Sequence, residues 1–350
     1  ESDFLAYRRV NEQFAEAVMD EVGDEPAIVF IQDYHFALLP GLLKWRLPNA
    51  VICQFWHIPW PNPEAFRICP WQTELLDGLL GNDLLSFHIQ YHCNNFLETV
   101  DRTVECHIDR ERFAVRRSGQ TTHVRPHAIS IAPQELRSRM TKSPKRAAIE
   151  IRKRLRLAGE RLIVGIDRVD YTKGIIERLQ AFDELLQRRP EWKRRVRMVQ
   201  VGAPSRVHLP EYRDLGDRIE RLVDEINWRH SEGAWRPVDY LNEHAGPDLI
   251  GALATVADVC VVSSLHDGMN LVAKEFVALR DDLQGVLVLS RFTGAARSLT
   301  DAILVNPYST HDFADSLHRA LVMNPDEQAD RMRRLRESVD RHTVYDWAQG

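Results

Sequence analysis

Residues 161–174 read Arg-Leu-Ile-Val-Gly-Ile-Asp-Arg-Val-Asp-Tyr-Thr-Lys-Gly, and this stretch decides the fold. The apolar run from Arg161 to Ile166 predicts a buried strand, and the periodic apolar residues after Gly174 predict a helix that covers a sheet. A strand that passes directly into a helix is half of a βαβ unit, from which parallel sheets are built. The stretch therefore predicts an α/β protein.

The same order of strand, polar turn and helix recurs on both sides of this stretch. Alternating strands and helices predict right-handed crossovers and parallel sheets, with polar side chains gathered at the carboxyl ends of the strands. The predicted strands cover 27–31, 50–55, 83–87, 122–131, 161–166, 196–201, 259–262 and 286–289. The predicted helices cover 36–45, 71–80, 88–100, 144–157 and 175–187, and a polar excursion is expected at 110–120.

A charged helix from about Pro144 to Leu157 separates two series of these units. We therefore expect two doubly wound Rossmann-like domains, residues 1–140 and 141–335, followed by a helix at 336–350 that crosses back to the first domain. The chain opens without Met and directly in an amphipathic pattern. The first domain is accordingly expected to be incomplete at its start.

Composition excludes several classes of protein. The net charge is -5, and the 46 basic and 51 acidic residues are interspersed, so no basic stripe for nucleic acid is expected. The five cysteines form no Cys-x-x-Cys pair, which argues against a disulfide framework or a zinc site. No apolar run reaches the roughly 20 residues of a membrane span. We expect a cytoplasmic protein that acts on small molecules, and a homo-oligomer stays open.

Arg168 and Lys173 lie five residues apart where the strand gives way to the helix. Two cations in such a turn can converge on one anion, and the dipole and free N–H groups of the helix start add to the attraction. A diphosphate fits this description. The alternative is a pair of hydrated surface charges on either side of a turn, and this segment by itself leaves both interpretations open.

A second segment, His266 to Glu275, follows the strand predicted at 259–262. Gly268 lets a ligand approach the backbone, and the first helical N–H groups are free to bind hydroxyls or phosphate. Glu275 is expected about two turns into the helix, where its carboxylate could accept hydrogen bonds from a ribose. In the alternative interpretation, Asp267 is only an N-cap and Glu275 is a surface charge.

Polar residues also follow strands of the first domain. Asp33, His35 and His57 come after the strands at 27–31 and 50–55 and are expected at one rim, where each could orient a hydroxyl. Arg206 follows the strand at 196–201 and could bind a phosphate. A structural role for the histidines and an exposed position for Arg206 are the alternatives.

Six segments, taken in order, resemble the trehalose-6-phosphate synthase family of retaining glycosyltransferases, glycosyltransferase family 20. The resemblance spans roughly Tyr7 to Trp347. The segments are Gln32-Asp33-Tyr34-His35, His57-Ile58-Pro59-Trp60-Pro61, Arg168-Val169-Asp170-Tyr171-Thr172-Lys173-Gly174, Asp267-Gly268-Met269-Asn270-Leu271-Val272-Ala273-Lys274-Glu275, Gly285-Val286-Leu287-Val288-Leu289-Ser290 and Val305-Asn306-Pro307-Tyr308.

The resemblance implies a GT-B fold, in which two Rossmann-like domains face a cleft and the second domain binds the nucleotide sugar. It implies that Arg168 and Lys173 neutralise the leaving diphosphate and that Glu275 holds the ribose. The implied catalytic residues are Arg168, Lys173, Asp267 and His57. The implied donor contacts are Gly268, Met269, Asn270, Leu271, Val272 and Glu275, and the implied acceptor contacts are Asp33, Tyr34, His35 and Arg206.

The implied reaction transfers glucose from a nucleoside diphosphate glucose, with UDP-glucose as the favoured donor, to glucose 6-phosphate and yields trehalose 6-phosphate. No metal cofactor is expected, because such proteins usually work without one and the chain has no Asp-x-Asp pair.

Two alternatives to this reaction stay open. This chain has Ser86, Ser130, Ala132 and His266 where the family usually has other residues, so another phosphorylated acceptor, such as glycerol 3-phosphate, is an alternative. A catalytically silent relative that binds sugar phosphates and regulates a partner is a second. Its signature would be loss of the cation pair or of Glu275, and all three residues are present.

Overall fold

The computed structural model describes residues 1–141 and 143–349. The chain divides into two compact units, Glu1–Ala128 and Ile129–Gly350, each built around its own sheet. The α/β fold with two Rossmann-like sheets is thereby confirmed.

The first unit carries a six-stranded sheet in the order β1-β2-β3-β6-β5-β4. Strands β1, β2, β3 and β6 are parallel neighbours in that order, whereas β5 runs antiparallel to both β4 and β6. The elements are α1 (Ser2–Val22), β1 (Ala27–Gln32), a 3₁₀ turn η1 (Tyr34–Phe36), α2 (Leu39–Lys44), β2 (Ala50–Phe55), α3 (Pro63–Phe66), α4 (Gln72–Leu79), β3 (Leu84–Phe87), α5 (Gln90–Thr103), β4 (His107–Asp109), β5 (Ala114–Arg117) and β6 (Gln120–Pro126).

The second unit begins with two helices and then alternates strands with helices. Its elements are α6 (Pro133–Ser138), α7 (Pro144–Arg154), β7 (Arg161–Arg168), η2 (Tyr171–Lys173), α8 (Ile175–Arg188), η3 (Pro190–Trp192), β8 (Val196–Ala203), α9 (Pro210–His230), β9 (Val238–Leu241), α10 (Pro247–Val256), β10 (Val259–Val262), α11 (Leu271–Leu279), β11 (Val286–Ser290), η4 (Gly294–Arg297), β12 (Ile303–Val305), α12 (Thr310–Val322), α13 (Pro325–Arg341) and α14 (Val344–Gln349).

The strand order of the second sheet indicates the edge at which a ligand would bind. All six strands run parallel in the order β12-β11-β10-β7-β8-β9. The chain therefore fills one half of the sheet from β7 to β9 and then returns to fill the other half beside β7. Ligands of doubly wound folds bind at this reversal, outside the carboxyl ends of the two central strands. In the second unit these strands are β7 and β10.

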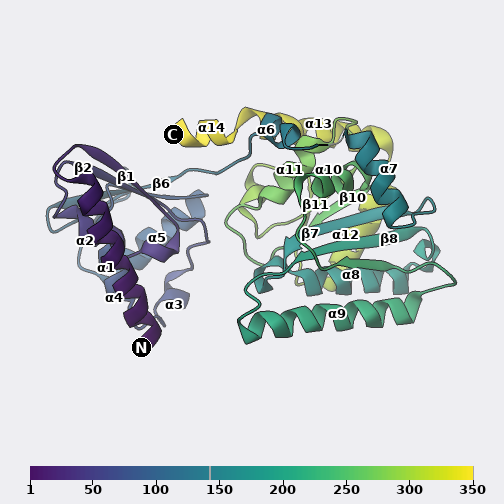
Figure 1. The fold of residues 1–350 in the computed structure, drawn as a ribbon, viewed down its shortest axis with the longest axis horizontal. Helices are drawn as coiled ribbons and strands as arrows, with labels where there is room; N and C mark the ends of the chain where they lie inside the picture. Colours follow the sequence, from purple (N-terminus) through teal and green to yellow (C-terminus); the bar gives the residue numbers. More distant parts are fainter. Residues whose placement is uncertain (142, 350) are drawn as a thin grey trace. The chain divides into compact units, whose positions relative to one another are not determined.

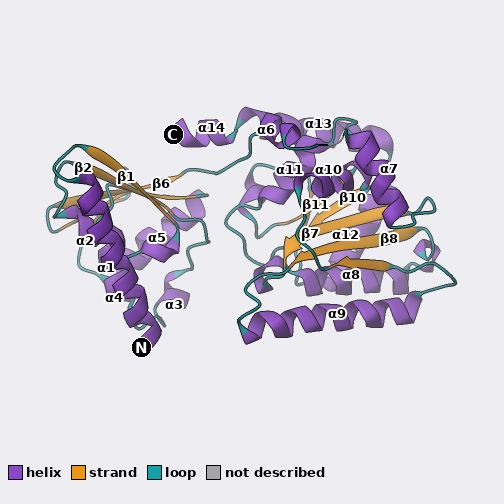
Figure 2. Cartoon of the chain, viewed as in Figure 1, coloured by secondary structure: helices purple, strands orange, loops and turns teal. Residues whose placement is uncertain are grey.

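Helices cover both faces of the second sheet. Figure 1 shows α8 and α9 on one side of the strands and α10 and α11 on the other, and Figure 2 shows the strands as a single layer between helices. Because both faces are covered, the strands are apolar almost throughout, and β8 and β10 are buried along nearly their whole length. Val164, Phe182, Met198 and Val261 are among the fully buried core residues.

The structure corrects several predicted elements. The excursion expected at 110–120 contains β5, whose antiparallel pairing with β4 and β6 the sequence did not indicate. Strand β7 continues to Arg168, two residues beyond its predicted end. Strand β6 ends at Pro126, five residues before its own predicted end at residue 131. Strands β9 and β12 were not predicted, because Asp239 interrupts the apolar run of β9 and β12 is only three residues long.

Two of the five cysteines are fully buried. All five cysteines are free, and burial raises the pKa of both Cys93 and Cys260 to about 12. Neither of these two thiols therefore forms a thiolate at neutral pH. Within the described residues, no helix has the length and apolar character needed to span a bilayer.

The segment between the two sheets belongs to the second unit. The chain leaves the first unit after Ala128, and α6 lies with the second. The last helix, α14, is tied to the same segment, because the Val344 N–H donates to the Ile131 carbonyl and Tyr345 hydrogen-bonds Glu135. The expected return of residues 336–350 to the first domain stays a prediction.

Candidate functional site

The cation-bearing turn follows β7, and a second turn that follows β10 is bonded to it. The Leu265 N–H donates to the Thr172 carbonyl over 2.7 Å, and the Ser263 hydroxyl donates to the Gly174 carbonyl over 2.8 Å. These bonds join the carboxyl ends of the two central strands. The two segments singled out from the sequence therefore meet at the reversal point of the sheet.

Two residues fix the shape of the first turn. The Asp170 carboxylate accepts hydrogen bonds from the N–H and the hydroxyl of Thr172, at 2.9 and 2.7 Å. Gly174 adopts φ 63°, and a Cβ atom there would lie 2.2 Å from the Ser263 carbonyl oxygen. Only glycine fits both the left-handed conformation and this close approach. The turn is thus held rigidly against the segment after β10.

Lys173 and Asp267 form the central ion pair of the site. The Lys173 ammonium lies 2.7 Å from the Asp267 carboxylate, and the two side chains are 17% and 15% exposed. Burial acts to raise the pKa of Asp267, but Lys173 and hydrogen bonds from Asn270 and Ser264 outweigh it and hold that pKa below its usual value. Asp267 is therefore a carboxylate at neutral pH, with its charge compensated by one lysine.

Arg168 is the last residue of β7, and its side chain is exposed. The Arg168 side chain makes no hydrogen bond or ion pair with any residue that the structure describes. A guanidinium with no protein partner at the carboxyl end of a central strand is available to a ligand anion.

The structure corrects the cap and the position predicted for the helix after β10. Asn270, not Asp267, caps α11: its side chain accepts from the Ala273 N–H over 3.1 Å, and its backbone has φ 84°. The helix begins at Leu271, so Glu275 lies about one turn into it, not two. Leu271 and Val272 contribute the first helical N–H groups.

Glu275 is a half-buried carboxylate without a protein partner in the described part of the chain. Burial raises its pKa above the ordinary value for glutamate. Buried polar groups in proteins are almost always hydrogen-bonded, so a carboxylate in this state indicates a ligand that supplies donors.

The loop 267–269 packs on the turn that follows β11. The Gly294 N–H donates to the Asp267 carbonyl, and the Ala295 N–H donates to the Met269 carbonyl over 2.9 Å. A Cβ on Gly294 would lie 1.9 Å from the Gly268 oxygen. The backbone around Gly268 and Met269 is therefore fixed by a third strand end, which the sequence reasoning did not include.

Arg178 is a buried residue that the sequence reasoning missed. Its guanidinium is fully buried beneath the site, 2.7 Å from the Asp167 carboxylate, and it donates to Gln200 and Ser263. These partners belong to or directly follow β7, β8 and β10, so one side chain links three strand ends. Gly165 leaves room for it, since a Cβ there would lie 1.9 Å from the guanidinium.

Lys274 was also missed, although it lies inside a quoted segment. It is 3% exposed, and its ammonium donates to the Ile129 carbonyl over 3.0 Å. Burial lowers its pKa to about 8. The signal available from the sequence was a lysine at an apolar helix position, one residue before Glu275.

The low pKa of Lys274 predicts a pH-dependent stability. Below about pH 8 the folded chain carries a buried charge that the unfolded chain hydrates freely, which opposes folding. Between about pH 8 and 10 the folded state loses this proton first, so the free energy of unfolding rises with pH. Lys274→Met should therefore raise the free energy of unfolding at pH 7 by up to about 3 kcal/mol, and by less at pH 9.5.

Urea unfolding at the two pH values measures this effect. Lys153→Met, on an exposed position of α7, is the control and should change stability little at either pH. A Lys274→Met variant that is less stable than the parent chain at pH 7 would show that the hydrogen bond to Ile129 outweighs the desolvation of the ammonium.

Arg206 lies in the same unit and contacts the first turn through Tyr212. Its guanidinium donates to the Tyr212 hydroxyl over 2.8 Å, and that hydroxyl lies 3.4 Å from the Asp170 carboxylate. Arg206 itself is exposed and has φ 49°. This arrangement places a third cation next to the turn that carries Arg168 and Lys173.

In the first unit, Asp33 and His57 follow β1 and β2 and are bonded to each other. The Asp33 carboxylate accepts from the His57 backbone N–H over 3.1 Å, and the His57 ring lies 2.8 Å from the Gln32 side-chain oxygen. Burial lowers the pKa of His57, although Asp33 opposes this effect. His57 is therefore a neutral hydrogen-bonding group at pH 7, and Gln32 is a partner that the sequence reasoning missed.

Tyr34 and His35 form the 3₁₀ turn that follows Asp33. Their rings stack with centroids 4.2 Å apart, and His35 is exposed. Their backbone carbonyls accept from α1, from the Tyr7 hydroxyl and the Asn11 amide respectively. The turn is thus held by α1, while His35 is exposed to solvent.

No three potential metal ligands from His, Cys, Asp and Glu come together in residues 1–141 and 143–349. The candidate site consists instead of cations, carboxylates and free backbone groups.

Comparison with known proteins adds a family and several relatives. The model of glycosyltransferase family 20 matches residues 1–350. An α,α-trehalose-phosphate synthase (UDP-forming) A of Dictyostelium discoideum is 36% identical over 99% of this chain and 46% of its own length. A trehalose-6-phosphate synthase of Mycolicibacterium smegmatis is 40% identical over 98% of this chain and 69% of its own length. The chain thus spans less than half of the first relative.

Solved structures agree with these relatives. A trehalose-6-phosphate synthase structure from E. coli, bound with UDP-2-fluoro glucose, superposes with a TM-score of 0.92 and 32% identity, over 99% of this chain and 76% of the other. An α,α-trehalose-phosphate synthase (UDP-forming) from Burkholderia xenovorans, in complex with glucose-6-phosphate, gives a TM-score of 0.92 and 30% identity, over 99% and 78%.

Proposed function

Because this chain belongs to glycosyltransferase family 20, we propose that it transfers glucose from UDP-glucose to glucose 6-phosphate, with retention of configuration, and forms trehalose 6-phosphate and UDP. The relatives named above carry this activity in their names. The observation that carries the proposal for this chain is the contact between Lys173 and Asp267 at the reversal point of the second sheet.

We assign the donor to the second unit. Arg168 and Lys173 neutralise the diphosphate, which gains negative charge as its bond to glucose breaks. Glu275, half-buried and without a partner among the described residues, accepts hydrogen bonds from the ribose hydroxyls. Asp267 holds the glucose, together with backbone groups from Gly268 to Val272.

We assign the acceptor mainly to the first unit. Asp33 and a neutral His57 bind sugar hydroxyls, with Tyr34 and His35 beside them. Arg206, next to the cation-bearing turn, binds the phosphate of the acceptor. A guanidinium can meet a phosphate with two parallel hydrogen bonds, which fixes both the position and the orientation of the acceptor.

The reaction requires one proton transfer and no protein nucleophile. The acceptor hydroxyl attacks the anomeric carbon from the face that the diphosphate leaves, and a phosphate oxygen of that leaving group takes the hydroxyl proton. The protein supplies fixed charges at the developing anion and the exclusion of water. A metal is not needed in this scheme, because two cations perform its electrostatic task.

A panel of donors and acceptors tests the proposal. UDP-, ADP- and GDP-glucose are each supplied with glucose 6-phosphate or glycerol 3-phosphate, and release of the nucleoside diphosphate is measured. The highest rate is expected with UDP-glucose and glucose 6-phosphate. A higher rate with glycerol 3-phosphate would show that glucose 6-phosphate is not the preferred acceptor. No release of nucleoside diphosphate with any pair would refute the proposed activity and favour the catalytically silent, ligand-binding alternative.

Glu275→Gln tests the ribose contact. The amide keeps the shape of the side chain but loses the charge that strengthens its hydrogen bonds, so the KM for UDP-glucose should rise by about tenfold or more. In the parent chain, donor binding should weaken as the pH falls toward the raised pKa of Glu275, and this acid limb should disappear in the variant.

Glu225→Gln, on an exposed position of α9, is the matched control and should leave the KM unchanged. An unchanged KM in Glu275→Gln would assign the ribose to other groups.

A further inference from the structure

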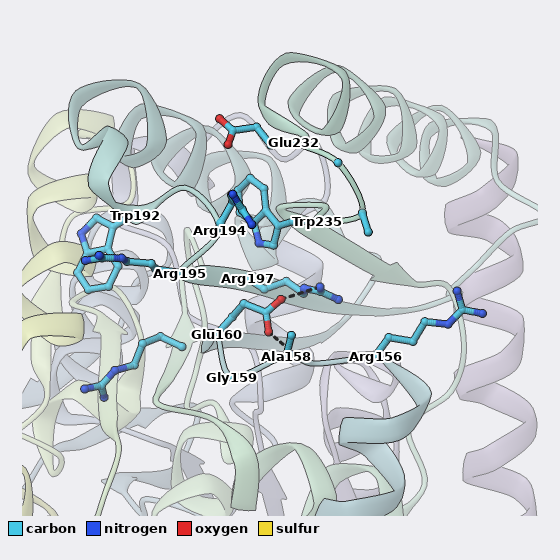
Figure 3. Close-up of a pocket in the computed structure, with 13 residues that line it drawn as sticks. Arg156, Ala158, Gly159, Glu160, Trp192, Arg194, Arg195, Arg197, Glu232 and Trp235 are labelled. Atoms are coloured by element: carbon cyan, nitrogen blue, oxygen red, sulfur yellow. Dashed lines mark hydrogen bonds and ion pairs between the residues drawn. The ribbon is translucent and has the colours of Figure 1, made fainter.

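A pocket of about 720 Å³ lies away from the residues described so far. Figure 3 shows it in the second unit, with Arg197 and Glu160 joined by an ion pair near its centre. The side chains of Arg156 and Arg195 lie at its rim and point away from that centre to opposite sides. The pocket is lined at the starts of β7 and β8, by Arg161 and Arg197, whereas the donor-side residues follow the ends of these strands.

The pocket and the donor side are separated by the length of a strand. Arg161 lines the pocket and Arg168 ends the same strand, seven residue steps later. At about 3.3 Å per residue this places the two residues about 23 Å apart. A ligand in the pocket is therefore a separate ligand and not a part of the sugar nucleotide.

Three guanidinium groups of the pocket are uncompensated. Arg156, Arg194 and Arg195 are exposed, and none makes a side-chain hydrogen bond or an ion pair with the described residues. Arg156 and Arg194 also adopt left-handed backbone conformations, φ 51° and 64°, which are costly for residues other than glycine. Glu232 is the one lining carboxylate without an ion-pair partner in the described part, and it lies across Trp235 from Glu160 in Figure 3.

Two buried N–H groups in the pocket wall also lack acceptors. Arg197 is 6% exposed, and its Nε has no hydrogen-bond partner although its other nitrogens bind Glu160 and Asp239. Trp235 is 6% exposed, and its Nε1 likewise has no partner within the described residues. Buried donors are rarely left unpaired, so these two N–H groups are available to an acceptor that comes from outside the chain.

From these observations we propose that the pocket is a second anion site, which binds a small molecule that carries a diphosphate. Exposed arginine side chains can turn toward a bound anion, and three such guanidinium groups match the charge of two adjacent phosphates and offer the paired donors that phosphate oxygens accept. The volume admits a ligand of nucleotide size. The ring of Trp192, whose own N–H is bonded to His318, offers an apolar surface to the remainder of such a ligand.

Calorimetric titration with pyrophosphate distinguishes the two sites, because pyrophosphate presents the shared chemistry without a sugar or a base. The unmodified chain should bind two equivalents. Arg194→Ser with Arg195→Ser should lose the pocket site, with an affinity there at least about tenfold weaker, and keep the donor site. Arg168→Ala should show the opposite pattern.

The control removes the same charge elsewhere: Arg218→Ser with Arg221→Ser, on exposed positions of α9, should still bind two equivalents. Thermal melting of each variant shows that it is folded. Two equivalents in the folded Arg194→Ser, Arg195→Ser variant, or a single equivalent in the unmodified chain that Arg168→Ala abolishes, would overturn the proposed pocket site. Two equivalents in Arg168→Ala would instead count against the proposed donor site, so the two failures are distinguishable.

Titration of the Arg168→Ala variant with a nucleoside diphosphate and with a sugar diphosphate then identifies the kind of molecule. Tighter binding of the nucleotide assigns the Trp192 surface to a base, and tighter binding of the sugar diphosphate assigns the pocket to a phosphorylated sugar. Binding of neither ligand, where pyrophosphate binds, would contradict the nucleotide-sized ligand.

Discussion

Arg168→Ala and Lys173→Ala are each expected to lower the turnover of UDP-glucose with glucose 6-phosphate by at least about 100-fold. This is the usual loss when one preorganised group that stabilises developing charge is removed. Arg168 has no protein partner among the described residues, so its removal deletes a ligand contact and little else. The loss should appear in kcat, because the leaving diphosphate is most negative in the transition state.

The Lys173 variant needs a further comparison, since it also strips Asp267 of its partner. Lys173→Arg keeps a cation near Asp267 and should recover part of the lost turnover. If Lys173 had a merely structural role, the turnover would recover fully in this variant. Arg221→Ala, which removes an exposed charge from α9, should retain full activity. Near-normal turnover in either alanine variant would refute the diphosphate clamp.

The largest effect on stability is expected for Arg178→Met. This change removes the guanidinium from a fully buried ion pair and leaves Asp167 without its partner, which should lower the free energy of unfolding by about 3–5 kcal/mol. Burial already raises the pKa of Asp167 in spite of Arg178 and Lys173, and the variant should raise it further. The carboxyl group would then remain protonated at higher pH.

Urea unfolding monitored by far-ultraviolet circular dichroism measures this change. Arg221→Met removes a charge of the same kind from an exposed position and should alter the free energy of unfolding by less than about 1 kcal/mol. A similarly small effect for Arg178→Met would show that the three strand ends are held together by other contacts.

Much of the architecture could be predicted because most strands of a doubly wound sheet are short apolar runs that are easy to recognise in the sequence. β2 and β10 were predicted with their observed ends, since each is an apolar run between polar turns. Strand β12 was missed because three residues carry too little pattern, and β9 was missed because Asp239 interrupts its apolar run. The pairing of β5 depends on contacts distant in the sequence, which no local pattern contains.

Candidate site residues could be predicted where charged or polar residues lie close together in the sequence, directly after a predicted strand. Arg168, Lys173, Asp267 and Glu275 were singled out because they follow predicted strands, and their roles stay predictions. The ion pair between Lys173 and Asp267 could not be inferred, because it joins residues 94 positions apart. Arg178 was hidden for a different reason: on a helix, a buried arginine and an exposed one look alike in the sequence.

The ion pair of Lys173 and Asp267 also has a consequence for selectivity. An anion that draws Lys173 toward itself leaves Asp267 uncompensated in a mostly desolvated position. A ligand that offers phosphate alone must bear that penalty. A ligand that offers phosphate and hydroxyl groups together relieves it, because the hydroxyls hydrogen-bond the carboxylate. Under the proposed donor assignment, this built-in counterion is expected to favour an intact sugar nucleotide over free phosphates and spent nucleotide.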